Sequence, residues 1–155
     1  PSSAASDVYK RQAKDCVERQ KLNAQRSFIS LTYLGESARV LGNRDQLDEL
    51  CQNLCDNAIR YNRPGGKVQI ITACTRDGHC SLTVKDNGIG IPKEAQSSVF
   101  ERFYRVDKSR SKATGGTGLG LAIVKHIARI HNARIKLESE IGEGTTITVL
   151  FETAH

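Results

Sequence analysis

The sequence predicts an α+β two-layer sandwich, in which helices cover one face of a mixed, mainly antiparallel sheet. Strand-like segments follow one another with short turns between them, and amphipathic helical segments separate the pairs. The chain has 155 residues, of which 38% are hydrophobic and 26% charged. That length and composition suit one globular domain with a single core, and they exclude a wholly disordered chain.

The N-terminal segment is predicted to precede the domain. Residues 1–12 are small and polar, which is typical of a linker, and residues 13–25 could form a short helix or the end of a preceding one. From Phe28 to Leu34 apolar and polar side chains alternate, which predicts the first strand. Residues 1–25 are therefore expected to be a linker with helical character, and residues 26–155 the folded domain. Gly35 and Gly42 mark turns, with room for a short strand between them.

Residues 45–61 form the most strongly predicted helix. Asp45 is the expected N-cap, because an aspartate side chain can accept a hydrogen bond from a free backbone N–H of the first turn. The turn sequence at residues 62–66 (Asn-Arg-Pro-Gly-Gly) ends the helix. The apolar face of this helix recurs at helical spacing and consists of Leu47, Leu50, Cys51, Leu54, Cys55 and Ala58.

The second half of the chain is predicted to complete the sheet. Residues 68–74 and 80–85 are strand-like and flank Asp77-Gly78, a hairpin signal. Residues 104–116 are polar, basic and poor in apolar anchors, which predicts a mobile loop. The remaining predicted elements are short helical pieces within 93–103, a helix over 117–131, and strands over 135–139 and 145–152.

The net charge of +6 does not predict nucleic-acid binding. Residues 1–27 and 92–115 each carry six basic and three acidic side chains, whereas the rest of the chain is balanced. A nucleic-acid interface needs a broad basic face with interleaved aromatic residues, and this pattern provides none. No nucleic-acid partner is expected.

Membrane insertion is not predicted either. The longest apolar stretch, Leu119 to Val124, is about six residues, whereas a spanning helix needs about twenty. The first residues are polar and lack the apolar core of a signal peptide. The sequence begins with Pro1 and contains no Met, so we expect a fragment of a longer protein.

The five cysteines do not predict a disulfide framework, because their number is odd and no secretory signal is present. Cys51 and Cys55 lie four residues apart on a predicted helix, so a metal pair is conceivable. No second cysteine pair or suitably spaced histidine accompanies them, so we favour small apolar residues on a buried face.

Two glycine clusters and two asparagines suggest a phosphate site. The second cluster, within residues 115–120, directly precedes a predicted helix, whose N-terminus attracts phosphate. Asn53 and Asn57 lie on one side of the predicted helix, and their side-chain oxygens are of the type that binds Mg²⁺. Taken singly, the glycines could be ordinary turns and the asparagines ordinary surface residues. Neither the Walker A nor the Rossmann glycine spacing is present.

Taken together, these motifs resemble a known family. They are Asn53-x-x-x-Asn57, Asp86-x-Gly88-x-Gly90, the segment 100–105 (Phe-Glu-Arg-Phe-Tyr-Arg), and the segment 116–121 (Gly-Thr-Gly-Leu-Gly-Leu). Their order and spacing are similar to the N, G1, F and G2 boxes of sensor histidine kinases. Residues 26–152 look like the catalytic and ATP-binding domain of such kinases, a Bergerat-type fold of the superfamily that includes gyrase.

The resemblance implies a role for each matching residue. Asn57 would bind Mg²⁺ on the phosphates, with Asn53 nearby, and Asp86 would accept the adenine amino hydrogen. Thr145 would support the base, and Arg105 would approach the terminal phosphate, so Asn57 and Arg105 are the implied catalytic residues. The other implied nucleotide contacts are Arg60, Tyr61, Gly88, Ile89, Gly90, Ile91, Phe103, Gly116, Thr117, Gly118, Leu119, Gly120 and Leu121.

The resemblance also implies the cofactors and partners. They are ATP, Mg²⁺, a histidine-bearing dimerisation domain and a response regulator, and the expected location is cytoplasmic, with a membrane-anchored parent protein. No histidine of this chain has the sequence context of the family's phosphate acceptor. Two alternatives remain: a free-standing ATPase or protein-serine kinase of the same superfamily, and a nucleotide-binding module without turnover.

Overall fold

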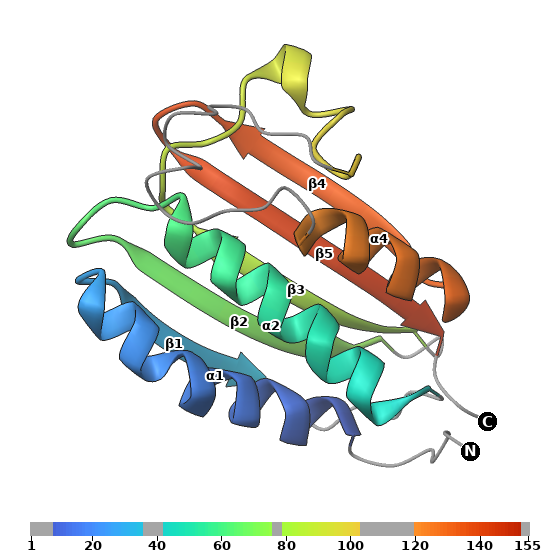
Figure 1. The fold of residues 1–155 in the computed structure, drawn as a ribbon. Helices are drawn as coiled ribbons and strands as arrows, with labels where there is room; N and C mark the ends of the chain where they lie inside the picture. Colours follow the sequence, from blue (N-terminus) through green and yellow to red (C-terminus); the bar gives the residue numbers. More distant parts are fainter. Residues whose placement is uncertain (1–7, 36–41, 76–78, 103–119, 153–155) are drawn as a thin grey trace.

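The computed structural model describes residues 8–35, 42–75, 79–102 and 120–152. Figure 1 shows a single sheet with α1, α2 and α4 on one of its faces. The two-layer α+β prediction is thereby confirmed. The helices are α1 (Val8–Arg26), α2 (Arg44–Arg60) and α4 (Gly120–Ile130), with a short 3₁₀ helix η1 (Lys93–Ala95). The strands are β1 (Ser30–Gly35), β2 (Lys67–Cys74), β3 (His79–Asp86), β4 (Arg134–Glu140) and β5 (Gly144–Glu152).

The sheet has the strand order β1-β2-β3-β5-β4. Among the described strands, β1 and β2 pair in parallel and the other three neighbouring pairs are antiparallel. Because β3 and β5 are neighbours although far apart in sequence, the end of β3 lies beside the start of β5. This adjacency positions the site described below.

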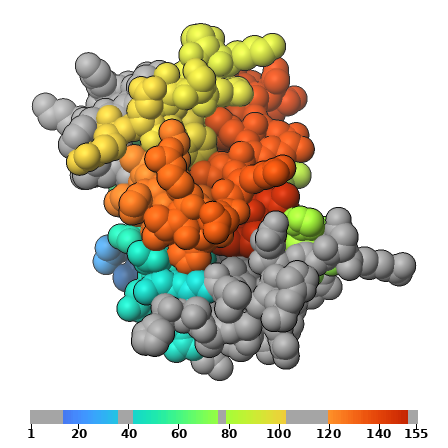
Figure 2. Space-filling view, turned by 90° about the vertical axis from the view of Figure 1, so that its right-hand side faces the viewer, coloured from blue at the N-terminus to red at the C-terminus, as the bar shows by residue number. Residues whose placement is uncertain are grey.

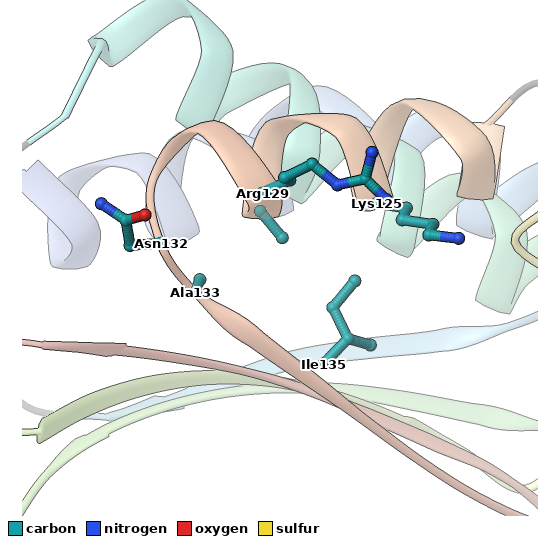
Figure 3. Close-up of a pocket in the computed structure, with 6 residues that line it drawn as sticks. Lys125, Arg129, Asn132, Ala133 and Ile135 are labelled. Carbon is teal, nitrogen blue, oxygen red and sulfur yellow. The ribbon is translucent and has the colours of Figure 1, made fainter.

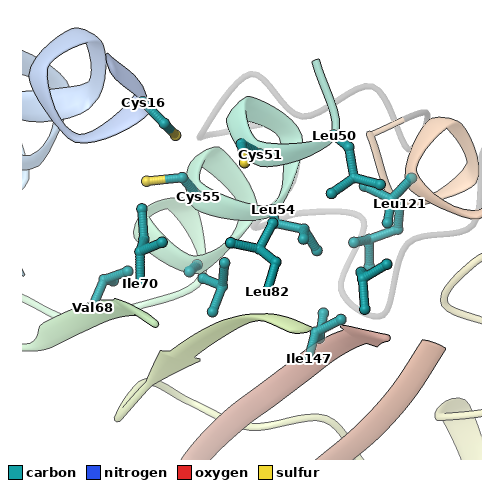
Figure 4. Close-up of a cluster of buried hydrophobic side chains, with 14 of the residues drawn as sticks. Cys16, Leu50, Cys51, Leu54, Cys55, Val68, Ile70, Leu82, Leu121 and Ile147 are labelled. Carbon is teal, nitrogen blue, oxygen red and sulfur yellow. The ribbon is translucent and has the colours of Figure 1, made fainter. Parts of the chain in front are cut away.

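The core lies between the sheet and its helices. On α2 the predicted apolar face is buried, and β2, β3 and β5 contribute their inward-facing alternate residues. Figure 4 shows Leu50 and Leu54 of α2 above Ile70, Leu82 and Ile147 of the strands. Burying each such side chain stabilises the fold by about 1.5–3 kcal/mol, so α2 is fixed firmly against the sheet.

The start of α2 differs from the prediction. Asn43, and not Asp45, is the N-cap: its Oδ1 accepts a hydrogen bond from the backbone N–H of Gln46 at 3.0 Å. Asp45 lies in the first turn, where its negative charge still favours the positive end of the helix. His131, which follows α4, accepts a hydrogen bond from the backbone N–H of Asn43 at its Nε2 (3.1 Å). Figure 2 shows this face of the molecule, with α4 in orange beside α2 in cyan.

Two other element predictions need correction. The helix α1 begins at Val8, so residues 8–12 are helical and not linker. Its Cys16 and Ala24 are buried and form part of the core cluster. Within the described part of 93–103 the only helix is η1. The expected strand between Gly35 and Gly42, the hairpin turn and the loop at 104–116 lie outside the described residues.

The cysteines follow the prediction only in part. Cys74 of β2 and Cys80 of β3 are directly paired and form a disulfide. This disulfide was not predicted, because an odd number of cysteines does not indicate which residues the strand register brings together. Cys16, Cys51 and Cys55 are free and buried, as expected for small apolar residues. Burial raises the pKa of the Cys51 thiol, so this thiol stays protonated. The described residues contain no group of three or more side chains that could hold a metal ion.

None of the helices in the described part of the chain combines the length and the apolar character that a membrane span requires.

Candidate nucleotide-binding site

Three polar side chains form a row across one end of the sheet. Asp86 ends β3 and pairs with Thr145 of β5, and Thr145 pairs in turn with Ser139 of β4. Directly paired residues project from the same face, which here is the face that the helices cover. The core therefore gives way to polar groups at this end of the sheet.

The Asp86 carboxylate is held by the backbone. Its Oδ1 accepts hydrogen bonds from the backbone N–H groups of Gly88 (2.8 Å) and Thr145 (3.2 Å). Burial raises the pKa of Asp86 to about 6, and these two hydrogen bonds oppose that rise. Its Oδ2 has no hydrogen-bond partner within the part of the chain that the structure describes. The site thus presents a positioned, half-buried acceptor, which is the group needed to read an amino N–H.

Two glycines allow the loop after Asp86 and the turn between β4 and β5 to approach each other closely. A Cβ on Gly144 would lie 2.1 Å from the backbone oxygen of Asp86, and one on Gly90 would lie 2.2 Å from that of Glu140. Both glycines also have positive φ angles, +129° and +78°. Any other residue would displace the loop after Asp86 from the turn between β4 and β5.

The loop from Asp86 to Ile91 is fixed from both sides. The Ile89 N–H donates to the backbone oxygen of Tyr61 at the end of α2 (3.2 Å). The Ile91 N–H donates to Ser139 Oγ (2.8 Å), and Gln96 Nε2 donates to the backbone oxygens of Ile91 (3.0 Å) and Ser139 (3.2 Å). Such a loop is preorganised, since few of its backbone groups must change partner when a ligand enters.

Arg63 holds the outer side of the same loop. Its Nη2 donates to the backbone oxygens of Gly88 (3.1 Å) and Gly142 (2.9 Å). Arg63, Ser139 and Gln96 were not predicted from the sequence. Register could have indicated Ser139, because it stands opposite Thr145. Nothing in the sequence signals that Arg63 or Gln96 contacts these carbonyl groups.

Asn53 and Asn57 project from α2 as predicted, and both are half-buried. Within the described residues neither side-chain amide has a hydrogen-bond partner. A Cβ on Gly120, the first residue of α4, would lie 3.6 Å from Asn53 Oδ1, so the start of α4 approaches α2 at this point. The Asn53 amide therefore lies beside the start of α4, where the helix dipole is positive, and Asn57 lies one turn further along α2.

Comparison with known proteins agrees with this geometry. The profile of the family described as histidine kinase-, DNA gyrase B- and HSP90-like ATPases matches residues 42–155. The chain belongs to this family. Its fold and motifs are those of the ATP-binding catalytic domain of a sensor histidine kinase.

Named relatives and solved structures support the assignment. The sensor-like histidine kinase SenX3 of Mycolicibacterium smegmatis is 49% identical over 136 residues, which cover 87% of this chain and 35% of that protein. The sensor histidine kinase RppB of Synechocystis is 46% identical over 108 residues, covering 70% of this chain and 24% of that protein. The chain thus spans about a third of the length of SenX3. The solved mycobacterial sensor histidine kinase MprB is 29% identical, with a TM-score of 0.78 over 92% of this chain and 93% of that one.

Several residues that the family boxes imply have other contacts here. Arg60 pairs with Asp56 one turn earlier on α2 (2.9 Å), so a phosphate would compete with this carboxylate. Leu121 is buried in the core, so only its backbone can face a ligand. Ile89 and Ile91 are half-buried and flank Gly90. The remaining implied residues, Phe103, Arg105, Gly116, Thr117, Gly118 and Leu119, lie outside the described residues.

A separate hollow of about 440 Å³ lies between α4 and β4. Figure 3 shows Lys125 and Arg129 of α4 above Ile135 of β4. This hollow shares no residue with the loop after Asp86, so we assign it no part in nucleotide binding.

Proposed function

We propose that this domain binds Mg-ATP and donates the γ-phosphoryl group to a histidine on a separate dimerisation domain, from which a response regulator receives it. The Asp86 carboxylate carries the proposal. Its Oδ1 is held by two backbone N–H groups, and its Oδ2 is available to accept a hydrogen from the adenine amino group. A half-buried carboxylate is costly to maintain, which favours a functional reason for it.

The phosphates would extend from the base toward Asn53, Asn57 and the start of α4. An amide oxygen is a suitable Mg²⁺ ligand, and both amides are available to a ligand. Mg²⁺ would supply charge neutralisation on the phosphates, while the chain's own residues hold the nucleotide in place. Phosphoryl transfer depends chiefly on such positioning and electrostatic stabilisation.

The acceptor histidine is expected to lie on another domain. Both ring nitrogens of His131 are engaged, Nδ1 with the backbone oxygen of Ile127 (2.8 Å) and Nε2 with the N–H of Asn43. His79 begins β3 and Asp86 ends it, so these residues are separated by about 23 Å at 3.3 Å per residue. These contacts argue against His131 and His79 as the phosphate acceptor. Because ATP and response regulators are found in the cytoplasm, we place the domain there.

The first test is calorimetric titration of the chain with ATP, with and without Mg²⁺. Binding supports the proposal, and Asn57→Ala should weaken binding of Mg-ATP more than binding of ATP in EDTA. The second test is incubation with γ-labelled ATP, alone and with a histidine-bearing dimerisation domain. Acid-labile label on that domain alone supports the transfer. Release of phosphate without an acceptor would favour a free-standing ATPase, and binding without turnover in either mixture would favour a non-catalytic module.

A further inference from the structure

The Ser139 hydroxyl makes three polar contacts on the strand beyond Thr145, in the row that begins with Asp86. Its Oγ accepts a hydrogen bond from the Ile91 N–H (2.8 Å), donates to the backbone oxygen of Gly144 (3.0 Å), and lies 2.8 Å from Thr145 Oγ1. The residue is half-buried on β4 and directly opposite Thr145.

The protons in this cluster can be counted. A hydroxyl group has one proton to donate and two lone pairs to accept with. The Ser139 proton goes to the Gly144 oxygen, which is an acceptor only, and the Ile91 N–H occupies one Ser139 lone pair. With the Ser139 proton directed to the Gly144 oxygen, the contact with Thr145 uses the second Ser139 lone pair, and Thr145 is then the donor in that hydrogen bond.

This count fixes the direction of the Thr145 hydroxyl. Its proton points to Ser139, so toward any ligand Thr145 Oγ1 can only accept. Asp86 beside it is likewise an acceptor when ionised, and its Oδ1 already holds the Thr145 N–H. The end of the site next to the base would therefore present acceptors only.

We propose that Ser139 determines base specificity, because it withdraws the Thr145 proton and makes this end of the site accept donors only. The proposal rests on the proposed function, in which Asp86 reads the nucleobase. A purine with an exocyclic amino group presents an N–H donor at its 6-position, where these acceptors can bind it. A purine with a carbonyl oxygen places a further acceptor at that position, and its donor moves to N1.

ATP and inosine triphosphate form a matched pair of probes, because they differ at the purine 6-position and in the N1 proton that accompanies that difference. The measurement is the ratio of their dissociation constants, determined by calorimetry with Mg²⁺ for the folded wild-type chain and its variants. In Ser139→Ala the Thr145 proton is released and can be donated to the inosine carbonyl. We expect the preference for ATP to fall by about tenfold, the scale of one hydrogen bond.

Three variants separate specificity from loop packing. Ser139→Thr keeps a hydroxyl group and should retain the wild-type ratio. Gln96→Ala removes hydrogen bonds to the same loop without changing the hydroxyl pair, so it should weaken both nucleotides alike. On a Thr145→Val background, Ser139→Ala should leave the ratio unchanged, because no hydroxyl proton remains to be redirected.

The outcomes distinguish the two proposals. If the wild-type chain binds neither nucleotide, the proposed function fails. If it prefers ATP and Ser139→Ala leaves that preference intact, the role of Ser139 is overturned while the proposed function stands. A thermal melt of each variant confirms that it is folded. If Ser139→Ala does not fold, Ser139→Thr tests the proposal, and loss of the ATP preference in Ser139→Thr would contradict the role of Ser139.

Discussion

The two ends of the β2–β3 hairpin are built in opposite ways. At one end Asp86 pairs with Val68. The Asp86 carboxylate is half-buried, its pKa is raised, and two backbone N–H groups donate hydrogen bonds to it. At the other end Cys74 and Cys80 pair directly and are joined by a disulfide. Between the two ends the strands carry ordinary core residues such as Ile70 and Leu82.

The two ends have opposite effects on the free energy of unfolding: the buried Asp86 charge lowers it and the disulfide raises it. The folded-state pKa of Asp86, about 6, exceeds its ordinary value of 3.8, so the folded protein binds this proton more tightly than the unfolded chain does. Stability is therefore lost as the pH rises from about 4 through 6, by about 1–3 kcal/mol. The disulfide raises the free energy of unfolding, because it lowers the conformational entropy of the unfolded chain.

The largest effect is expected where the turn between β4 and β5 passes the backbone of Asp86. Gly144→Ala would place a Cβ 2.1 Å from the Asp86 backbone oxygen, and it should lower the free energy of unfolding by about 3 kcal/mol. Gly142→Ala is the matched control: φ is also positive (+84°), but nothing lies within 4 Å, so the loss should be about 1 kcal/mol. Urea denaturation followed by circular dichroism measures both. Equal losses would show that the close approach of the two backbones has no special importance.

The second prediction concerns the carboxylate. Asp86→Asn keeps an oxygen for the Gly88 and Thr145 N–H groups but replaces the acceptor Oδ2 with an N–H donor. Nucleotide affinity should fall by about ten- to a hundredfold, while stability at pH 7.5 rises by about 1–3 kcal/mol because no buried charge remains. Calorimetry and thermal melts measure the two effects.

Glu138→Gln is the control for this variant. Glu138 is an exposed carboxylate whose ion pair with Lys136 (3.6 Å) contributes little, so neither quantity should change appreciably. If Asp86→Asn were less stable than the wild-type chain, the assigned cost of the carboxylate would be wrong.

The functional end of the hairpin was the more predictable from sequence. Asp86, Gly88 and Gly90 stand in a short local motif, and the buried face of α2 follows from helical spacing. Residue type and local spacing were sufficient to predict these features, since each lies within one turn, loop or helix. The same reasoning placed Asn53 and Asn57 on one side of α2.

What the sequence could not predict depends on register and on competition between neighbours. Ser139 matters only because β4 pairs with β5 so that it faces Thr145. The Cys74–Cys80 disulfide likewise requires the two residues to be cross-strand partners. The N-cap of α2 was misassigned by two residues because Asn43 and Asp45 are both good caps, and propensity cannot choose between them.

The third prediction tests the opposite end of the hairpin. Replacing Cys74 and Cys80 by serine should lower the free energy of unfolding, because the unfolded chain is no longer cross-linked. The loss should be about 2 kcal/mol, at the low end for a disulfide, since the bridge closes a short loop. Nucleotide affinity should not change, since the bridge and Asp86 are at opposite ends of β3. A reductant should reproduce the loss in the wild-type chain and have no further effect on the double variant. A weaker affinity for nucleotide would show that the two ends are coupled.

The smallest effect is a pH dependence that connects stability with binding. Because Asp86 Oδ1 already holds two N–H groups, protonation occurs at Oδ2 and changes the group that faces the base from an acceptor to a donor. The wild-type advantage over Asp86→Asn in ADP affinity should therefore shrink as the pH falls below about 6, by about tenfold per unit. Comparison with Asp86→Asn cancels the titration of the phosphates, which both proteins experience. Over the same range the stability of the wild-type chain should rise relative to that variant. An affinity ratio that stays constant from pH 7.5 to 5 would mean that the ionised Asp86 carboxylate does not read the base.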